Sequence, residues 1–226
     1  MLRLDPGSQP SVADALRRVP FTLAFLGAML LANALSGTVS GQIAPAVLDA
    51  RGIGVDAIRD GDLTRFVTAI FLSHDLPMLL RQLVFAAGVI GAAEWRWGSW
   101  RAAGLFFGLD FVVGAILLAA IALIPHLAPL AGVTDVGMSL GGFGLIGVFV
   151  ASWRHAGGWL AAIVGLVAAK YAIAPDPVAD GGHLIALFAG FGAGVFEPRR
   201  PGRADRAPAV RQGLGVSSDQ RRKDGS

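Results

Sequence analysis

Six apolar stretches, each close to the length that crosses a lipid bilayer, dominate this sequence. A helix needs about 20 mostly apolar residues to span the hydrocarbon core of a membrane. The stretches cover residues 21–40, 77–95, 102–124, 137–153, 158–173 and 182–196. The sequence therefore predicts an all-α fold, a polytopic membrane helix bundle with six transmembrane helices.

The composition agrees with a membrane domain. Hydrophobic residues make up 54% of the chain and charged residues only 15%, whereas soluble domains carry roughly a quarter charged residues. Such a chain has too few polar residues to form the surface of a soluble domain. We expect a cytoplasmic N-terminal segment at 1–19, one membrane domain at 20–197, and a disordered basic cytoplasmic tail at 198–226.

The positions of the arginines predict how the chain crosses the membrane. If both termini are cytoplasmic, the inner segments hold six arginines besides the basic tail: Arg3, Arg17, Arg18, Arg96, Arg101 and Arg154. The outer segments hold only Arg51, Arg59 and Arg65, accompanied by four aspartates. Because inner loops are enriched in Lys and Arg, this favours a multi-pass cell-membrane protein with both termini inside. An alternative interpretation makes the first stretch a cleavable signal peptide that ends near Ala34.

Several classes of site are excluded or lack support. The chain has no cysteine, so it forms no disulfide and no cysteine-based metal site. Its four histidines are scattered and lack the close pairing of a metal-binding helix. The basic tail has no second feature that indicates nucleic-acid binding. It is interpreted first as a topology signal and a solvated end, and attraction to anionic lipid of the bilayer is the alternative.

A few polar residues inside the predicted spans are candidates for function, because polar groups are costly in a membrane. They are Arg81, Gln82, Asp110, Ser139, Lys170 and His183. Ser139 begins the fourth span and His183 begins the sixth. Even-numbered spans start at the outer surface in this topology, so both residues lie at a similar depth. A serine and a histidine in contact can act as nucleophile and base.

Small residues on both helices favour that contact. Ser139 is followed by Gly141, Gly142, Gly144 and Gly147. His183 is followed by Ala186, Gly190 and Gly194, which share its helical face. Stripes of small residues occur where two membrane helices pack with their backbones close together. The pair is therefore predicted to reach hydrogen-bonding distance.

At these positions the chain resembles the rhomboid family, over residues 58–196. Residues 60–74, DGDLTRFVTAIFLSH, look like the "G-x-x-x-R-x-x-T-x-x-F-x-H" segment that leads into the second helix of that family. Residues 91–98, GAAEWRWG, are similar to its "G-x-x-x-E-x-x-x-G" loop motif, with one interval shorter by a residue. Residues 137–147, GMSLGGFGLIG, resemble the nucleophile helix, and Gly182 and His183, with Ala186 and Gly190, resemble the base helix.

The resemblance implies a six-helix bundle with an outward-opening, water-filled cavity, and an intramembrane serine endopeptidase. Ser139 would be the nucleophile and His183 the general base. Phe143 would stack on that histidine. Gln82 and the backbone around Gly137 and Leu140 would support the oxyanion. Membrane-anchored proteins would be the substrates, and no metal or organic cofactor is needed.

The chain departs from the family pattern near the proposed nucleophile. Leu140 follows Ser139 where the family has glycine, and Met78 and Gln82 replace a histidine and an asparagine that help to bind the oxyanion. His74, one turn before Met78, is either a displaced substitute or an exposed interfacial residue. The alternative function is therefore a catalytically impaired pseudoprotease that binds transmembrane helices of client proteins. A transporter or membrane scaffold is a third hypothesis, although the two halves of the chain show no repeat.

Overall fold

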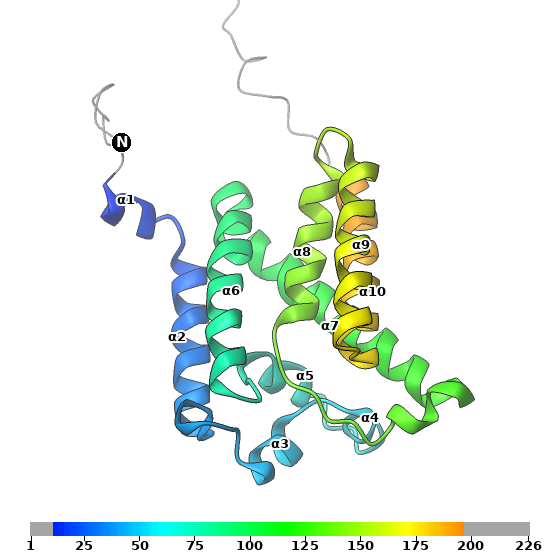
Figure 1. Cartoon of the computed structure of the whole chain (residues 1–226). Coiled ribbons are helices and arrows are strands. Elements are labelled where there is room, and N and C mark those ends of the chain that lie inside the picture. Colours follow the sequence, from blue (N-terminus) through cyan, green and yellow to red (C-terminus); the bar gives the residue numbers. More distant parts are fainter. Residues whose placement is uncertain (1–10, 197–226) are drawn as a thin grey trace, which may run out of the picture. The chain divides into compact units, whose positions relative to one another are not determined.

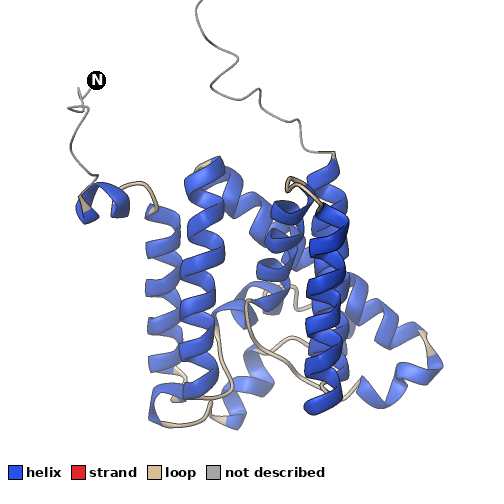
Figure 2. Cartoon of the chain, turned by 45° about the horizontal axis from the view of Figure 1, so that its top comes forward, coloured by secondary structure: helices blue, strands red, loops and turns tan. Residues whose placement is uncertain are grey.

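The computed structural model describes residues 11–196, which fold into helices joined by turns, with no β-strand in this range (Figures 1 and 2). The all-α prediction is confirmed. The elements, in chain order, are α1 (Val12–Leu16), α2 (Pro20–Leu35), η1 (Thr38–Ser40), α3 (Pro45–Arg51), α4 (Val55–Arg59), α5 (Arg65–Thr68), η2 (Ala69–Phe71), α6 (Leu76–Trp97), α7 (Ser99–Leu123), η3 (Pro125–Leu130), α8 (Ser139–Ala151), α9 (Ala156–Ile173) and α10 (Pro177–Val195). The predicted basic tail at 198–226 lies outside the described residues.

Four of these helices are long and apolar enough to cross a membrane: α6, α7, α9 and α10. The length and apolar composition of these four helices therefore indicate a membrane-associated protein. The apolar helices α2 and α8 are shorter, with 16 and 13 residues. Each predicted apolar stretch overlaps one of these six helices.

Two helix boundaries differ from the sequence-based expectation. The first helix was expected to reach residue 40, but α2 ends at Leu35, and Gly37 adopts a positive φ of 85° that turns the chain. The last helix was expected to begin at residue 182. It begins at Pro177 instead, because the side chain of Asp176 accepts a hydrogen bond from Ala179 N and proline suits a first helical turn.

The long helices run in alternating directions, so α6, α8 and α10 begin toward the same end of the bundle (Figure 1). Helix α8 packs most extensively on α10 and then on α7, while α2 packs on α6. Several outward-facing leucines and isoleucines are exposed, and only Val167 of α9 is buried. An apolar outer surface of this kind suits contact with lipid.

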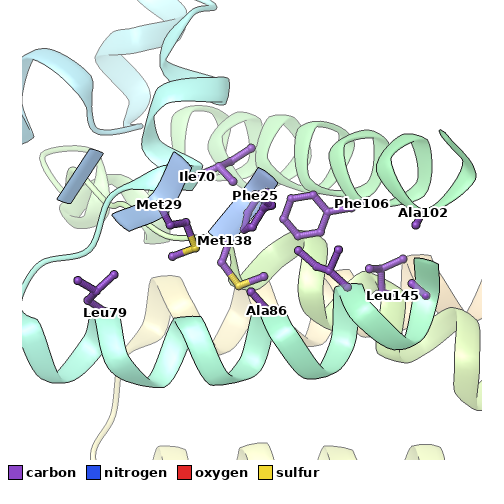
Figure 3. Packing of buried hydrophobic residues seen from close by; sticks show 11 residues of the cluster. Phe25, Met29, Ile70, Leu79, Ala86, Ala102, Phe106, Met138 and Leu145 are labelled. Atoms are coloured by element: carbon purple, nitrogen blue, oxygen red, sulfur yellow. The ribbon is translucent and has the colours of Figure 1, made fainter. Parts of the chain in front are cut away.

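The main core cluster joins α2, α6, α7, η2 and the start of α8. Its buried members include Phe25, Met29, Leu79, Phe106 and Met138 (Figure 3). Met138 directly precedes Ser139 and is fully buried in this cluster. The core therefore anchors the residue next to the candidate nucleophile.

The segment between α2 and α6 folds back on the loop that leads to α8. Ile53 and Asp135 exchange two backbone hydrogen bonds of 2.8 Å, and Gly137 N donates to Ala69 O at 2.9 Å. These bonds fix the extended stretch before Ser139 from one side. The segment thus supports the start of α8 although it contains no long helix.

Glu94, the acidic residue of the 91–98 motif, joins α6 to the start of α2. It is 1% exposed and accepts hydrogen bonds of 2.8 Å from Phe21 N and Thr22 N. The hydroxyl groups of Thr22 and Ser99 donate to it as well. The carboxylate therefore caps the N–H groups that the first turn of a helix leaves unpaired.

Candidate active site

Ser139 and His183 lie in contact. Ser139 is the first residue of α8, His183 lies in the second turn of α10, and the distance from Oγ to Nε2 is 2.9 Å. Both side chains are half-buried, so the pair is neither sealed in the core nor fully exposed. The predicted contact between these two residues is present in the structure. Their catalytic role stays a prediction.

The contact depends on the close approach of α8 and α10. A Cβ atom on Gly190 would overlap the carbonyl oxygen of Gly144, and one on Gly147 would overlap the carbonyl oxygen of Leu187. Gly194 packs in the same way, because its Cβ would lie 2.8 Å from Val148 O. The two backbones therefore touch at three places, and this holds the side chains of Ser139 and His183 at hydrogen-bonding distance.

Phe143 fixes the plane of the histidine ring. Its ring lies one turn after Ser139 and stacks on His183, with centroids 4.2 Å apart and an angle of 12° between the planes. Phe85 of α6 packs on Phe143 in turn, with ring centroids 5.9 Å apart. The imidazole is therefore held by aromatic packing.

The first turn of α8 has two backbone N–H groups without a partner among the described residues, those of Ser139 and Leu140. The first N–H groups of any helix lack an intrahelical acceptor. The next one, Gly141 N, donates at 2.8 Å to Asp110 Oδ2 from the middle of α7. Asp110 therefore caps this helix from a neighbouring one and leaves the N–H groups beside the serine hydroxyl available.

The side chain of Leu140 is accommodated between α7 and α10. A Cβ atom on Gly182 would lie only 2.8 Å from Leu140 Cδ2, and one on Gly114 would lie 3.9 Å from Leu140 Cδ1. The leucine thus occupies space that these two glycines leave open. The rhomboid pattern has glycine at this position. The larger leucine side chain fits here because it lies beside Gly182 and Gly114.

Gln82 and Met78 both lie against Gly137, two residues before Ser139. A Cβ atom on Gly137 would overlap Gln82 Nε2 and would lie 3.1 Å from Met78 Cε. The other end of the amide, Gln82 Oε1, accepts a hydrogen bond of 2.6 Å from Ser73 Oγ. The amide nitrogen therefore faces the backbone that leads into α8, whereas Met78 offers only a methyl group there.

His74 is engaged elsewhere. Its Nε2 lies 3.2 Å from Asp135 Oδ1, and its backbone N–H donates to Met78 Sδ at 3.4 Å. The hydrogen bond with Asp135 raises the pKa of the His74 imidazole above its usual value, while partial burial opposes the rise. His74 thus ties the start of α6 to the loop before α8, and makes no hydrogen bond with Gln82 or Ser139 in the described range.

Of the other polar residues singled out in the spans, Lys170 has a defined partner. Its Nζ lies 2.9 Å from Asp180 Oδ2, one helical turn before His183. This ion pair joins α9 to α10. The side chain of Arg81 is exposed on α6.

The contributions of two residues to the site, Asp110 and Ser73, were not predicted from the sequence. Asp110 was recognised as a polar residue inside a span, but its partner lies on another helix and could not be located from spacing. Ser73 was overlooked because His74 was matched to the histidine of the 60–74 motif. The motif ends in F-x-H, so counting from Phe71 puts its histidine at position 73. In this chain position 73 is Ser73, and His74 lies one residue later.

The arrangement brings together a serine hydroxyl, an imidazole and backbone N–H groups, and acyl transfer uses groups of these kinds. In the described residues, no group of three His, Cys, Asp or Glu side chains is placed to hold a metal ion. Comparison of the sequence with protein-family models found no match, and comparison with curated proteins found none either.

Proposed function

We propose that this protein is an intramembrane serine endopeptidase of rhomboid type, which hydrolyses peptide bonds of membrane-anchored proteins. The observation that supports it most directly is the 2.9 Å contact between Ser139 Oγ and His183 Nε2. The order of the motifs along the chain agrees with this proposal. In this proposal α2 and α8 complete a six-helix bundle in the cell membrane, with both termini in the cytoplasm.

Catalysis begins with attack of Ser139 Oγ on the carbonyl carbon of the scissile bond, while the hydroxyl proton passes to His183 Nε2. The C–N bond then breaks, and His183 returns this proton to the leaving amine nitrogen. A water molecule next attacks the acyl ester and gives a proton to His183. The ester bond breaks, and Ser139 recovers its proton.

The negative oxygen of each tetrahedral intermediate needs donors close to Ser139. The unpaired N–H groups of Ser139 and Leu140 provide two of them in this proposal. The Gln82 amide nitrogen, which faces Gly137, provides a third. One such donor contributes about 2.7–4 kcal/mol to transition-state stabilisation. This set makes up for the donor that Met78 lacks.

Helix α10, which carries His183, and its neighbour α9 have apolar exposed side chains that suit an apolar substrate segment. The exposed residues of α10 and α9 include Phe188, Val195, Leu166 and Ile173. A transmembrane segment of another protein reaches this surface by diffusion within the bilayer, whereas a soluble peptide does not. The substrate class is therefore a membrane-anchored protein, cut near or within its transmembrane helix.

Labelling with a fluorophosphonate in detergent micelles tests the proposal, because this reagent phosphonylates serines that have an activated hydroxyl. We expect labelling at Ser139 that is abolished in the Ser139→Ala and His183→Ala variants. Matched controls are Ser152→Ala, at the other end of α8, and His155→Ala, before α9. Both controls should label like the unchanged protein.

A client-binding pseudoprotease is the second candidate, and the methyl group of Met78 at a donor position favours it. In that case the unchanged protein would resist the fluorophosphonate, while its helices would still retain a transmembrane peptide. Full resistance of a folded, monodisperse sample would overturn the protease proposal.

A further inference from the structure

Ser73 occupies an unusual place for a hydroxyl side chain. It is fully buried in the loop between η2 and α6, and its Oγ donates to Gln82 Oε1 at 2.6 Å. A buried hydroxyl needs a hydrogen-bond partner, and in the described residues Gln82 is the partner it has. The two residues therefore form one polar unit near the start of α6.

The backbone of Ser73 is held on both sides by buried side chains. Ser73 N donates to Asn33 Oδ1 at 2.9 Å, and Ser73 O accepts from Thr38 Oγ1 at 3.1 Å. Asn33 is fixed in turn by its own donation to Phe71 O at 2.8 Å. These bonds hold the Ser73 backbone against the end of α2 and η1, and so fix the position of its hydroxyl.

The fixed hydroxyl decides which way the Gln82 amide faces. Oε1 is the acceptor of the amide and Nε2 is its donor. The buried hydroxyl proton of Ser73 has no other acceptor among the described contacts, so Oε1 is the end of the amide that meets it. Nε2 therefore lies on the opposite side, where it covers Gly137. A glutamine side chain has one more rotatable bond than an asparagine, so without this contact its amide would sample several orientations.

We propose that Ser73 is a positioning residue, which holds the Gln82 amide with its donor toward the oxyanion beside Ser139. This inference rests on the proposed protease function. Ser73 itself touches neither the nucleophile nor the base in the described contacts. It acts only through Gln82, so its effect must vanish when the amide is absent.

A double-mutant cycle tests this dependence, with the second-order rate of fluorophosphonate labelling of Ser139 as the readout. We expect Ser73→Ala to slow labelling roughly five- to tenfold, as loss of one typical hydrogen bond does. Gln82→Met, which keeps the length and removes the donor, should slow it roughly 100-fold or more. Adding Ser73→Ala to Gln82→Met should change nothing further.

Two more measurements separate positioning from a general loss of order. The pH profile of labelling reports on His183, and it should keep its midpoint in Ser73→Ala because Gln82 does not titrate. Gly137→Ala should slow labelling at least as much as Ser73→Ala, since its Cβ displaces the amide nitrogen and its φ of 137° strains any side chain. Gly132→Ala is the matched control, because a Cβ there meets nothing within 4 Å.

The outcomes distinguish the two proposals. If the unchanged protein is not labelled at Ser139, the protease function fails and the positioning role falls with it. If the unchanged protein is labelled and Ser73→Ala reacts at the same rate, only the positioning role is overturned. The same holds if Ser73→Ala slows the Gln82→Met variant as much as it slows the unchanged protein, or if the pH midpoint moves.

Discussion

The carboxyl group of Asp110 accepts a hydrogen bond of 2.8 Å from the backbone N–H of Gly141, which connects the middle of α7 with the first turn of α8. Gly141 is two residues after Ser139, so this bond fixes the orientation of the turn that carries the serine hydroxyl. A capping group usually lies just before its own helix. Here the cap comes from 31 residues away along the chain.

Replacement of Asp110 by leucine leaves Gly141 N without its acceptor in a buried place. An unpaired buried N–H costs about 1–3 kcal/mol, so we expect a loss of that size in the free energy of unfolding. Asp110→Asn retains an acceptor oxygen and should lose much less. Denaturant titration of both variants in micelles checks the difference. Equal stability of the two variants would show that the cap is unimportant.

The contact between α8 and α10 predicts a strong effect of one methyl group. Gly190→Ala places a Cβ against the carbonyl oxygen of Gly144, and such overpacking typically costs about 1–3 kcal/mol. The helices must also separate, so labelling of Ser139 should fall. Gly192→Ala lies on the same helix, where a Cβ meets nothing within 4 Å, and should leave both quantities unchanged. A similar loss in both variants would contradict the proposed close contact.

Glu94 accepts hydrogen bonds from two backbone and two side-chain donors. Glu94→Gln replaces one acceptor oxygen by an NH₂ group that faces these donors. We expect a loss of about 1–3 kcal/mol in the free energy of unfolding, because at least one buried donor becomes unpaired. Hydrogen exchange of the Phe21 and Thr22 amides should accelerate in the variant. Unchanged exchange would contradict the capping role.

The pair of His74 and Asp135 predicts a pH dependence. Because the folded protein raises the pKa of His74 above its usual value near 6.5, the charged imidazole binds Asp135 more favourably than it binds water. This stabilisation is complete below the unfolded pKa and is lost as the pH rises through the folded pKa. The two side chains are 39% and 40% exposed, so solvent screens the pair and its contribution is less than about 1 kcal/mol.

The measurement is the melting temperature between pH 5.5 and 8.5 for the unchanged protein and for His74→Gln. The difference between them should be largest at the acidic end and should shrink with rising pH. His126→Gln is a suitable control, because this histidine lies in η3 and is exposed. A difference that grows with pH would contradict the assignment.

The general architecture could be predicted from the sequence because it follows from hydrophobicity alone. Apolar stretches located all six apolar helices, and the small residues after Ser139 and His183 indicated which helices meet. Helix ends were less predictable, since they depend on local caps such as Asp176 and on the positive φ of Gly37.

The surroundings of the serine were harder to predict, because they depend on contacts between distant parts of the chain. The bulk of Leu140 appeared unfavourable from the sequence, and only the structure places it over Gly182 and near Gly114. Nothing in the spacing of Asp110 or Ser73 indicates their partners Gly141 and Gln82. Polar residues that act across helices leave no periodic signal along the chain.

The base of the candidate pair lies on the last helix that the structure describes, while the hydroxyl group lies two helices earlier. During synthesis, the ribosome therefore completes α8 well before α10 exists to contact it. A nascent chain that stops before residue 183 has the serine but no imidazole beside it. Molecules that end before α10 are consequently unable to form the pair, and any reactivity of Ser139 is deferred until α10 has docked on α8.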